Sequence, residues 1–141
     1  MDGYYLYRHM IHPDAANMVF LGCNAFTYAS ILTYNLQARW LAELLKGKHR
    51  LPDPVTMRQE IEDMKTWKRK WMPSNHGRAA MIGLHQLHYH DELLRDFAAN
   101  PERKKGFFAP LKEQVGPYEG KDYRRIVSGA WEQEEIRLRL V

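Results

Sequence analysis

The residues best suited to contact a ligand are Gly22, Cys23 and Asn24, which stand between a short apolar run, residues 18–21, and a long helical pattern. Glycine lets a ligand come close to the backbone. The first N–H groups of a helix carry a partial positive charge, so they attract negatively charged ligand atoms. The same residues also suit a plain strand-to-helix turn, with Asn24 as the helix N-cap. The residue types alone leave both interpretations open.

Two polar side chains, Gln37 and Arg39, stand among apolar neighbours in the middle of this helical pattern. A side-chain amide in such a place either faces a bound ligand or satisfies other buried polar groups of the protein. For Gln37 the sequence favours neither interpretation. For Arg39 we predict a structural pairing.

Residue types that bind metals cluster further along the chain, at His85, His88, His90, Asp91 and Glu92. His85 and His88 are three residues apart, which places them on one face of a helix. The spacing is not that of H-E-x-x-H, however, and the segment offers no evident fourth ligand. We therefore predict a solvated helix face and no metal site.

The sequence offers no residue to which we assign a catalytic role. Cys23 is the single cysteine, and no pattern typical of a cysteine nucleophile surrounds it. A small residue that fills a tight turn is the simpler interpretation. Neither a G-x-G-x-x-G pattern nor a Walker-type loop occurs, so the chain lacks the loops that hold a pyrophosphate.

The elements that must position these residues are mainly helical. Residues 4–10 alternate weakly and residues 18–21 are continuously apolar, so both are predicted to be short strands. A first helix is predicted over residues 25–46, where leucines and a tryptophan recur every four positions. Gly47 is the expected residue at its C-terminal end.

A second helix is predicted to begin after Asp53, its N-cap, with Pro54 at the first helical position, and to end before Pro73. The apolar positions of this helix, which we expect in the core, are Met57, Ile61, Met64, Trp67 and Trp71. A third helix is predicted over residues 78–98, and a weaker one near residues 107–115.

Composition narrows the class of protein. A chain of 141 residues with 45% hydrophobic residues is long and apolar enough for one globular domain. Its net charge of +4 is scattered along the chain, which disfavours a nucleic-acid-binding protein. The uncharged stretch 15–38 contains too many polar residues for a membrane span, so we expect it to be buried in protein.

Short motifs at both ends of the chain resemble the C-terminal part of flavin-containing monooxygenases. The first is an apolar run that ends in glycine and is followed by L-Q-A-R-W, and the second is a closing G-P-Y, Y-R, V, G and W series. The residues that carry the resemblance are Val19, Phe20, Leu21, Gly22, Leu36, Gln37, Ala38, Arg39, Trp40, Gly116, Pro117, Tyr118, Tyr123, Arg124, Val127, Gly129 and Trp131.

This resemblance implies a fold class that is mainly α with two short strands, as the C-terminal segment of an α/β flavoprotein that has two dinucleotide-binding domains. The chain would be a single unit, residues 1–141, in which strands within residues 1–24 complete the sheet of an FAD domain and residues 25–141 are helical. The family's two dinucleotide fingerprints, for FAD and NADP, lie upstream of the region matched here. The partners implied are therefore the missing N-terminal dinucleotide-binding domains.

The resemblance also implies an enzyme that uses FAD and NADPH to oxygenate soft nitrogen or sulfur atoms of small molecules. This chain alone would be inactive. Gly22, Cys23, Asn24 and Gln37 are the residues implied to contact the cofactor, with the flavin ring near the start of the first helix.

An alternative from another class is a free-standing helical interaction module without catalysis. Residues 134–141 alternate in charge and apolar character, so we see no C-terminal membrane anchor in them and expect a cytoplasmic protein. An upstream reading frame with two G-x-G-x-x-G motifs would distinguish the enzyme from the module.

Overall fold

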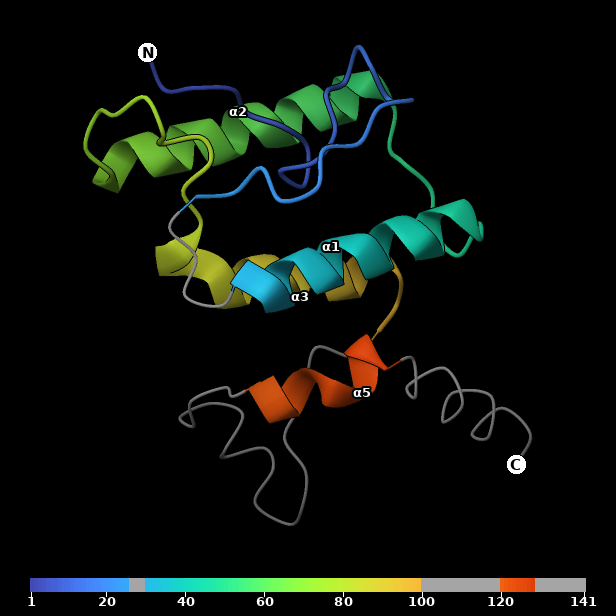
Figure 1. Cartoon of the computed structure of the whole chain (residues 1–141). Helices are drawn as coiled ribbons and strands as arrows, with labels where there is room; N and C mark the ends of the chain where they lie inside the picture. Colours follow the sequence, from blue (N-terminus) through green and yellow to red (C-terminus); the bar gives the residue numbers. More distant parts are fainter. Residues whose placement is uncertain (26–29, 100–119, 129–141) are drawn as a thin grey trace.

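The structure, a computed structural model, describes residues 1–25, 30–99 and 120–128, and this part of the chain is mainly helical (Figure 1). The helices are α1 (Ser30–Leu45), α2 (Pro54–Trp71), α3 (Gln86–Asp96) and the short α5 (Arg124–Val127). Two 3-10 turns, η1 (Gly83–His85) and η2 (Gly120–Tyr123), precede α3 and α5. The predicted helix near residues 107–115 and the residues from 129 onward lie outside the described residues.

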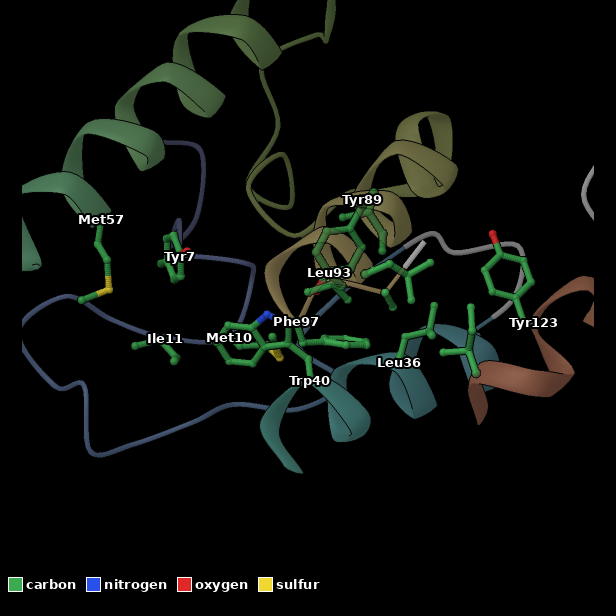
Figure 2. Close-up of a cluster of buried hydrophobic side chains, with 14 residues drawn as sticks. Tyr7, Met10, Ile11, Leu36, Trp40, Met57, Tyr89, Leu93, Phe97 and Tyr123 are labelled. Atoms are coloured by element: carbon green, nitrogen blue, oxygen red, sulfur yellow. The ribbon is translucent and has the colours of Figure 1, made fainter. Parts of the chain in front are cut away.

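Helices α1 and α3 pack side by side, and α5 packs against α1. The N-terminal segment, residues 1–25, runs between this helical pair and α2, as the blue trace in Figure 1 shows. The core lies where the three layers meet (Figure 2). Its largest fully buried apolar side chains come from the N-terminal segment and from all four helices or the turns that precede them: Met10, Ile11, Leu36, Trp40, Met57, Tyr89, Leu93, Leu94 and Tyr123.

The predicted end of the first helix and both predicted limits of the second helix are confirmed to within one residue. Gly47 has φ +73° just after α1, and its N–H donates to the Leu44 carbonyl at 2.9 Å, as expected of a glycine that ends a helix. At the start of α2, one oxygen of Asp53 accepts the N–H groups of Val55 at 2.9 Å and Thr56 at 3.1 Å. Asp53 is therefore the N-cap, and Pro54 is the first helical residue.

The two predicted strands are wrong for the described part of the chain. Residues 4–10 and 18–21 contain only isolated bridges, because the backbone reverses too early for a ladder to form. Arg8 and His9 have left-handed φ angles of 47° and 55°, so Tyr7 pairs with Ile11 instead of continuing straight. Ile11 in turn meets Val19 in a single antiparallel bridge.

The predicted starts of two helices are also wrong. Ala25 is not helical: its N–H donates to the Ala80 carbonyl at 2.8 Å, and it bridges to Met81 in parallel orientation. This pairing holds residues 78–82 as a loop, which explains why α3 begins at Gln86 and not at residue 78.

The buried face of α2 differs from the predicted one. Trp67 and Trp71 are 40% and 39% exposed, whereas Lys68 is fully buried. The Lys68 ammonium group donates to the carbonyls of Ala79 and Met81, both at 2.8 Å, so it satisfies the loop that α2 covers. Burial lowers the pKa of Lys68 to about 8.

Among the helices of the described ranges, none is long and apolar enough to cross a membrane.

Candidate functional site

The structure brings two of the predicted site residues, Gly22 and Gln37, into direct contact. The Gly22 N–H donates to the Oε1 atom of Gln37 at 2.9 Å. Gln37 is fully buried on α1, and its Nε2 atom donates to the Tyr89 hydroxyl at 2.8 Å. Gly22 has φ +74°, a backbone conformation that residues other than glycine rarely adopt. The Gln37 side chain of α1 therefore holds the backbone of this turn in place.

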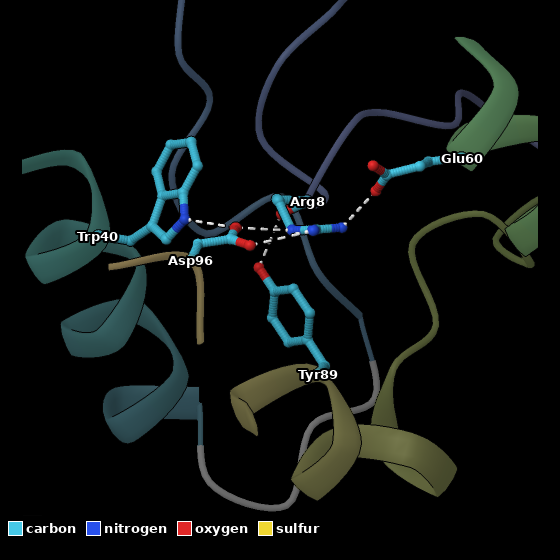
Figure 3. A network of polar contacts seen from close by, with 5 residues as sticks. All are labelled: Arg8, Trp40, Glu60, Tyr89 and Asp96. Carbon is cyan, nitrogen blue, oxygen red and sulfur yellow. Dashed lines mark hydrogen bonds and ion pairs between the residues drawn. The ribbon is translucent and has the colours of Figure 1, made fainter. Parts of the chain in front are cut away.

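This contact continues into a polar network that ties the N-terminal segment to all three long helices (Figure 3). The Tyr89 hydroxyl donates to the Arg8 carbonyl at 2.8 Å. The Arg8 guanidinium group binds both oxygens of Asp96, at 2.8 and 3.1 Å, and an oxygen of Glu60 at 2.7 Å. We call this set the Gln37 network; its members are Gly22, Gln37, Tyr89, Arg8, Asp96, Glu60 and Trp40, whose indole N–H donates to Asp96 at 2.8 Å.

Electrostatics make the Gln37 network rigid. Burial opposes the positive charge of Arg8, but the hydrogen bond and charge of Asp96 raise its pKa above the ordinary value. Burial likewise raises the pKa of Tyr89, so its hydroxyl stays a hydrogen-bond donor at neutral pH. A charged guanidinium group that binds a carboxylate with two parallel bonds holds its partner in a defined orientation.

The other two predicted site residues, Cys23 and Asn24, lie on the same turn but differ in their exposure to solvent. Cys23 is exposed and free. Asn24 is half-buried, and the residue after it pairs with the 80–82 loop, so the described backbone does not make it an N-cap. Because the Gly22 N–H already has an acceptor in Gln37, it is not free to bind a ligand. The part of this turn that a ligand could contact is thus the exposed Cys23 and the backbone of Gly22, against which the Tyr34 ring lies.

Arg39 behaves as predicted. Its guanidinium group forms an ion pair at 3.1 Å with Glu43, one turn further along α1, whose side chain is fully buried. Lys46 pairs with the same carboxylate oxygen at 3.1 Å. Both contacts are local and structural.

The histidine cluster does not form the solvated face that the sequence suggested. His90 is buried, with Nε2 at 2.9 Å from the Thr33 hydroxyl and Nδ1 at 3.2 Å from the Tyr123 hydroxyl. His85 is also buried but faces a different space, and His88 is exposed. Within the described ranges, no group of three or more metal-binding side chains could hold an ion.

A cleft of about 550 Å³ opens between the N-terminal segment, α2 and α3. We call it the histidine cleft, after the two buried histidines that line it, His9 and His85. It is separate from the turn at Gly22, since none of the four predicted cofactor-contact residues lines it. Sequence reasoning missed this cleft and most of the Gln37 network, because their members are brought together only by the tertiary fold.

Comparisons with known proteins place the chain in a family. A family model described as flavin-binding monooxygenase-like matches residues 3–137. The chain therefore belongs to the flavin-binding monooxygenase-like family, a family of flavin-dependent monooxygenases.

Similar proteins come from plants and mammals. The probable flavin-containing monooxygenase 1 of Arabidopsis thaliana is 31% identical over 120 residues, which are 84% of this chain and 21% of the relative. Human flavin-containing monooxygenase 3 is 31% identical over 107 residues, 73% of this chain and 19% of the relative. The dog protein of the same name is 30% identical over 132 residues, 89% and 24% of the two chains. This chain thus spans about a fifth to a quarter of the length of these relatives.

Proposed function

We propose that this chain is the C-terminal portion of an FAD- and NADPH-dependent monooxygenase that oxygenates soft nitrogen or sulfur atoms of small molecules. The family match over residues 3–137 carries this proposal. The relatives extend over four to five times the matched length, and this chain contains no dinucleotide-binding fingerprint. The proposal therefore assigns cofactor binding mainly to an N-terminal portion with two dinucleotide-binding domains.

The turn at Gly22 fits a flat ring system at its edge. The three atoms nearest to a Cβ at this position all belong to the Tyr34 ring, at 3.5–3.7 Å, so an aromatic ring lies beside the glycine. Glycine permits such close approach, and aromatic faces stack on planar ligands. When bound, the flavin supplies the redox and oxygen chemistry, and the protein positions it and excludes water.

The role of the Gln37 network in this proposal is positioning. Gln37 fixes the Gly22 turn, Tyr89 fixes Gln37, and Arg8 is fixed by Asp96 and Glu60. The network is buried or half-buried throughout, so it holds the turn without itself reaching a ligand. We assign none of these residues a catalytic role.

Exposed apolar side chains around the turn support a docking surface for the dinucleotide-binding portion. Met18, Phe20 and Leu21 are 54%, 38% and 44% exposed just before Gly22. Ile31 and Tyr34, on the first turns of α1, are 79% and 36% exposed. Apolar patches of this kind mark interaction sites, and the length that this chain lacks relative to its relatives provides the partner.

A glycine pair in the complete protein tests the placement of the flavin. Gly22 and Gly47 have nearly equal left-handed φ angles, 74° and 73°, but a Cβ atom at Gly47 would meet nothing within 4 Å. Both Gly22→Ala and Gly47→Ala introduce similar backbone strain. Only Gly22→Ala should lower the affinity for FAD, by about tenfold, equivalent to 1.4 kcal/mol.

The measurement is the dissociation constant for FAD after removal and replacement of the flavin. Equal affinities in the two variants would contradict the placement at Gly22.

A second expectation concerns the chain by itself, which should be colourless and should not consume NADPH, because it lacks both phosphate-binding loops. A yellow preparation with one flavin per isolated chain would contradict the proposal that an N-terminal portion provides most of the cofactor-binding site.

We also propose that the complete enzyme resides in the cytoplasm; a single cysteine, Cys23, allows no disulfide within this chain, which suits a reducing compartment. Cell fractionation followed by a high-salt wash should leave the protein in the supernatant. Recovery in the washed membrane pellet would contradict this location.

A further inference from the structure

We propose that the histidine cleft binds a small, neutral, hydroxylated aromatic molecule, at a site separate from the turn at Gly22. The cleft volume of about 550 Å³ lies within the range of small-molecule sites. The proposal concerns a ligand other than the flavin and does not depend on the proposed monooxygenase activity. It rests on two buried histidines that line the cleft, on its aromatic side chains and on the charges in and near it.

Two buried histidines of the cleft have hydrogen-bonding atoms to offer. His9 and His85 are only 7% and 9% exposed, and both line the cleft. Within residues 1–25, 30–99 and 120–128, the Nε2 atom of His9 and both ring nitrogens of His85 have no hydrogen-bond partner. Buried polar atoms are nearly always paired, because an unpaired one has lost its hydrogen bonds to water and gained none in return. A ligand that bonds to these atoms removes that penalty.

Both imidazoles are neutral at physiological pH. Burial is the main cause that lowers the pKa of His85 to about 4, and it lowers the pKa of His9 well below its ordinary value. The nearby charge of Lys68 acts in the same direction on both rings. A neutral imidazole has one N–H donor and one nitrogen acceptor. A hydroxyl group both donates and accepts, so it can pair with a ring nitrogen in either role.

The walls of the cleft are aromatic. Tyr5, Tyr7 and Trp67 line it, and the Trp67 ring meets the His85 ring edge-to-face at 5.1 Å between centroids. The hydroxyl group of Tyr5 is buried and, among the described residues, has no partner either. Aromatic walls favour an aromatic ligand, because ring pairs in offset or edge-to-face contact are stabilised beyond simple burial.

The charges in and near the cleft favour a neutral ligand. Glu60, Asp63 and Glu92 line it, whereas the guanidinium group of Arg8 is already paired with Asp96 and Glu60. The carboxylates therefore disfavour an anion. The Lys68 ammonium group does not line the cleft but lies 5.8 Å from the centre of the ring of Tyr5, a lining residue, so it disfavours a cation. Uncharged ligands avoid both penalties.

The backbone at His9 adds support. Arg8 and His9 are consecutive non-glycine residues with left-handed φ angles of 47° and 55°. Each such residue stores conformational strain that the surrounding structure must offset, and such strain is concentrated at ligand sites. The tight turn from Tyr7 to Ile11 presents the His9 ring to the cleft.

The experiment compares three probes of equal shape in the complete protein: 2-naphthol, naphthalene and 2-naphthoate. Ligand fluorescence near pH 7 gives each dissociation constant. We expect 2-naphthol to bind at least about tenfold more tightly than naphthalene, because only the hydroxyl satisfies the buried imidazole. We expect 2-naphthoate to bind at least about tenfold more weakly than 2-naphthol, because of the carboxylates.

Variants locate the binding site. His85→Phe keeps a ring of similar size but removes both nitrogens, so the preference for 2-naphthol over naphthalene should vanish; His9→Phe should reduce it. His76→Phe changes an exposed histidine outside the cleft and should have no effect. Gly22→Ala should also leave the preference unchanged, which separates this site from the proposed flavin contact.

Three results would overturn the proposal. One is equal affinity for 2-naphthol and naphthalene in the unmodified protein, a comparison that needs no variant to fold. Another is a preference that survives in His85→Phe. The third is tight binding of Zn²⁺ that His85→Phe abolishes, which would make the two histidines a metal site instead.

Discussion

At the residue scale, Gln37 shows how a buried amide supports a turn at some distance along the chain. Its oxygen accepts the Gly22 N–H and its nitrogen donates to the hydroxyl of Tyr89, which is 52 residues away. The sequence indicated that this amide must be satisfied but left its partners open. Sequence periodicity describes neighbours within one helix, so it carries no information on a tyrosine of another helix.

We predict that Gln37→Met destabilises the chain by about 1–3 kcal/mol, because the Gly22 N–H and the Tyr89 hydroxyl each lose a partner in a buried place. Denaturant unfolding measures the change. The control is Gln59→Met on α2, where an exposed glutamine bonds only to Asp63, at 2.9 Å, and where we expect a change within about 0.5 kcal/mol. Equal effects in the two variants would show that Gln37 does not fix the turn.

Lys68 is a residue that sequence reasoning placed on the wrong face of its helix. Two tryptophans beside it suggested the buried stripe, but lysine has a long apolar stem that packs under a loop while its ammonium group bonds to backbone. The sequence gives little indication that Lys68 is buried. The backbone carbonyls of residues 78–81 need hydrogen-bond donors, but no sequence pattern shows which residue supplies them.

We predict that Lys68 makes stability increase with pH. Between the folded pKa of about 8 and the ordinary value of 10.5, the unfolded chain binds a proton that the folded chain does not. Stability contributed by this group is therefore lost as the pH falls through 8. Relative to Lys68→Met, the unfolding free energy should increase by about 1 kcal/mol from pH 7 to pH 9. A difference that is independent of pH would show that the carbonyls hold the ammonium charge against burial.

At the scale of elements, local signals predicted helices well and strands poorly. Asp53 and Pro54 fixed the start of α2, and Gly47 fixed the end of α1, because capping depends on a few adjacent residues. The N-terminal segment failed as strands because a strand needs a partner, and the described part of the chain offers single bridges only. The left-handed φ angles at Arg8 and His9 cannot be predicted from the periodicity of apolar residues.

We predict that Asp53→Ala lowers the stability of the chain by about 1 kcal/mol, because two backbone N–H groups and the Thr56 hydroxyl lose their acceptor. Thermal unfolding followed by circular dichroism measures this. Asp63→Ala, an exposed position on the same helix, is the control and should change stability by less than about 0.5 kcal/mol. A smaller effect at Asp53 than at Asp63 would contradict the cap.

At the scale of the whole molecule, the exposed apolar side chains around Gly22 are the feature that most calls for a partner. The apolar run before Gly22 indicated their presence from the sequence, but their exposure follows only from the structure. Such a surface is stable in water only as part of an interface. The chain belongs to the family but spans only about a fifth of a relative's length, so the rest of such a protein is the partner that we propose for this exposed surface.

We predict that the isolated chain binds a hydrophobic dye and self-associates through this surface, and that Ile31→Glu reduces both effects at least about twofold. The control is Val55→Glu, since Val55 is 72% exposed and Ile31 79%, but Val55 belongs to α2 and not to the proposed docking surface. Light scattering and dye fluorescence give the two readouts. A monomeric chain that binds no dye would remove the physical support for a docking surface.

The most direct test of the central claim is the flavin content of the native protein that carries this chain. An antibody against residues 54–71 would capture it from its own cells, because this helix contains none of the residues of the proposed docking surface. Absorbance then gives the flavin bound per captured chain. We predict one FAD per chain, in a polypeptide or complex that contains two dinucleotide-binding domains. A colourless chain of 16.7 kDa, captured without any dinucleotide-binding partner, would contradict the account and favour a free-standing interaction module.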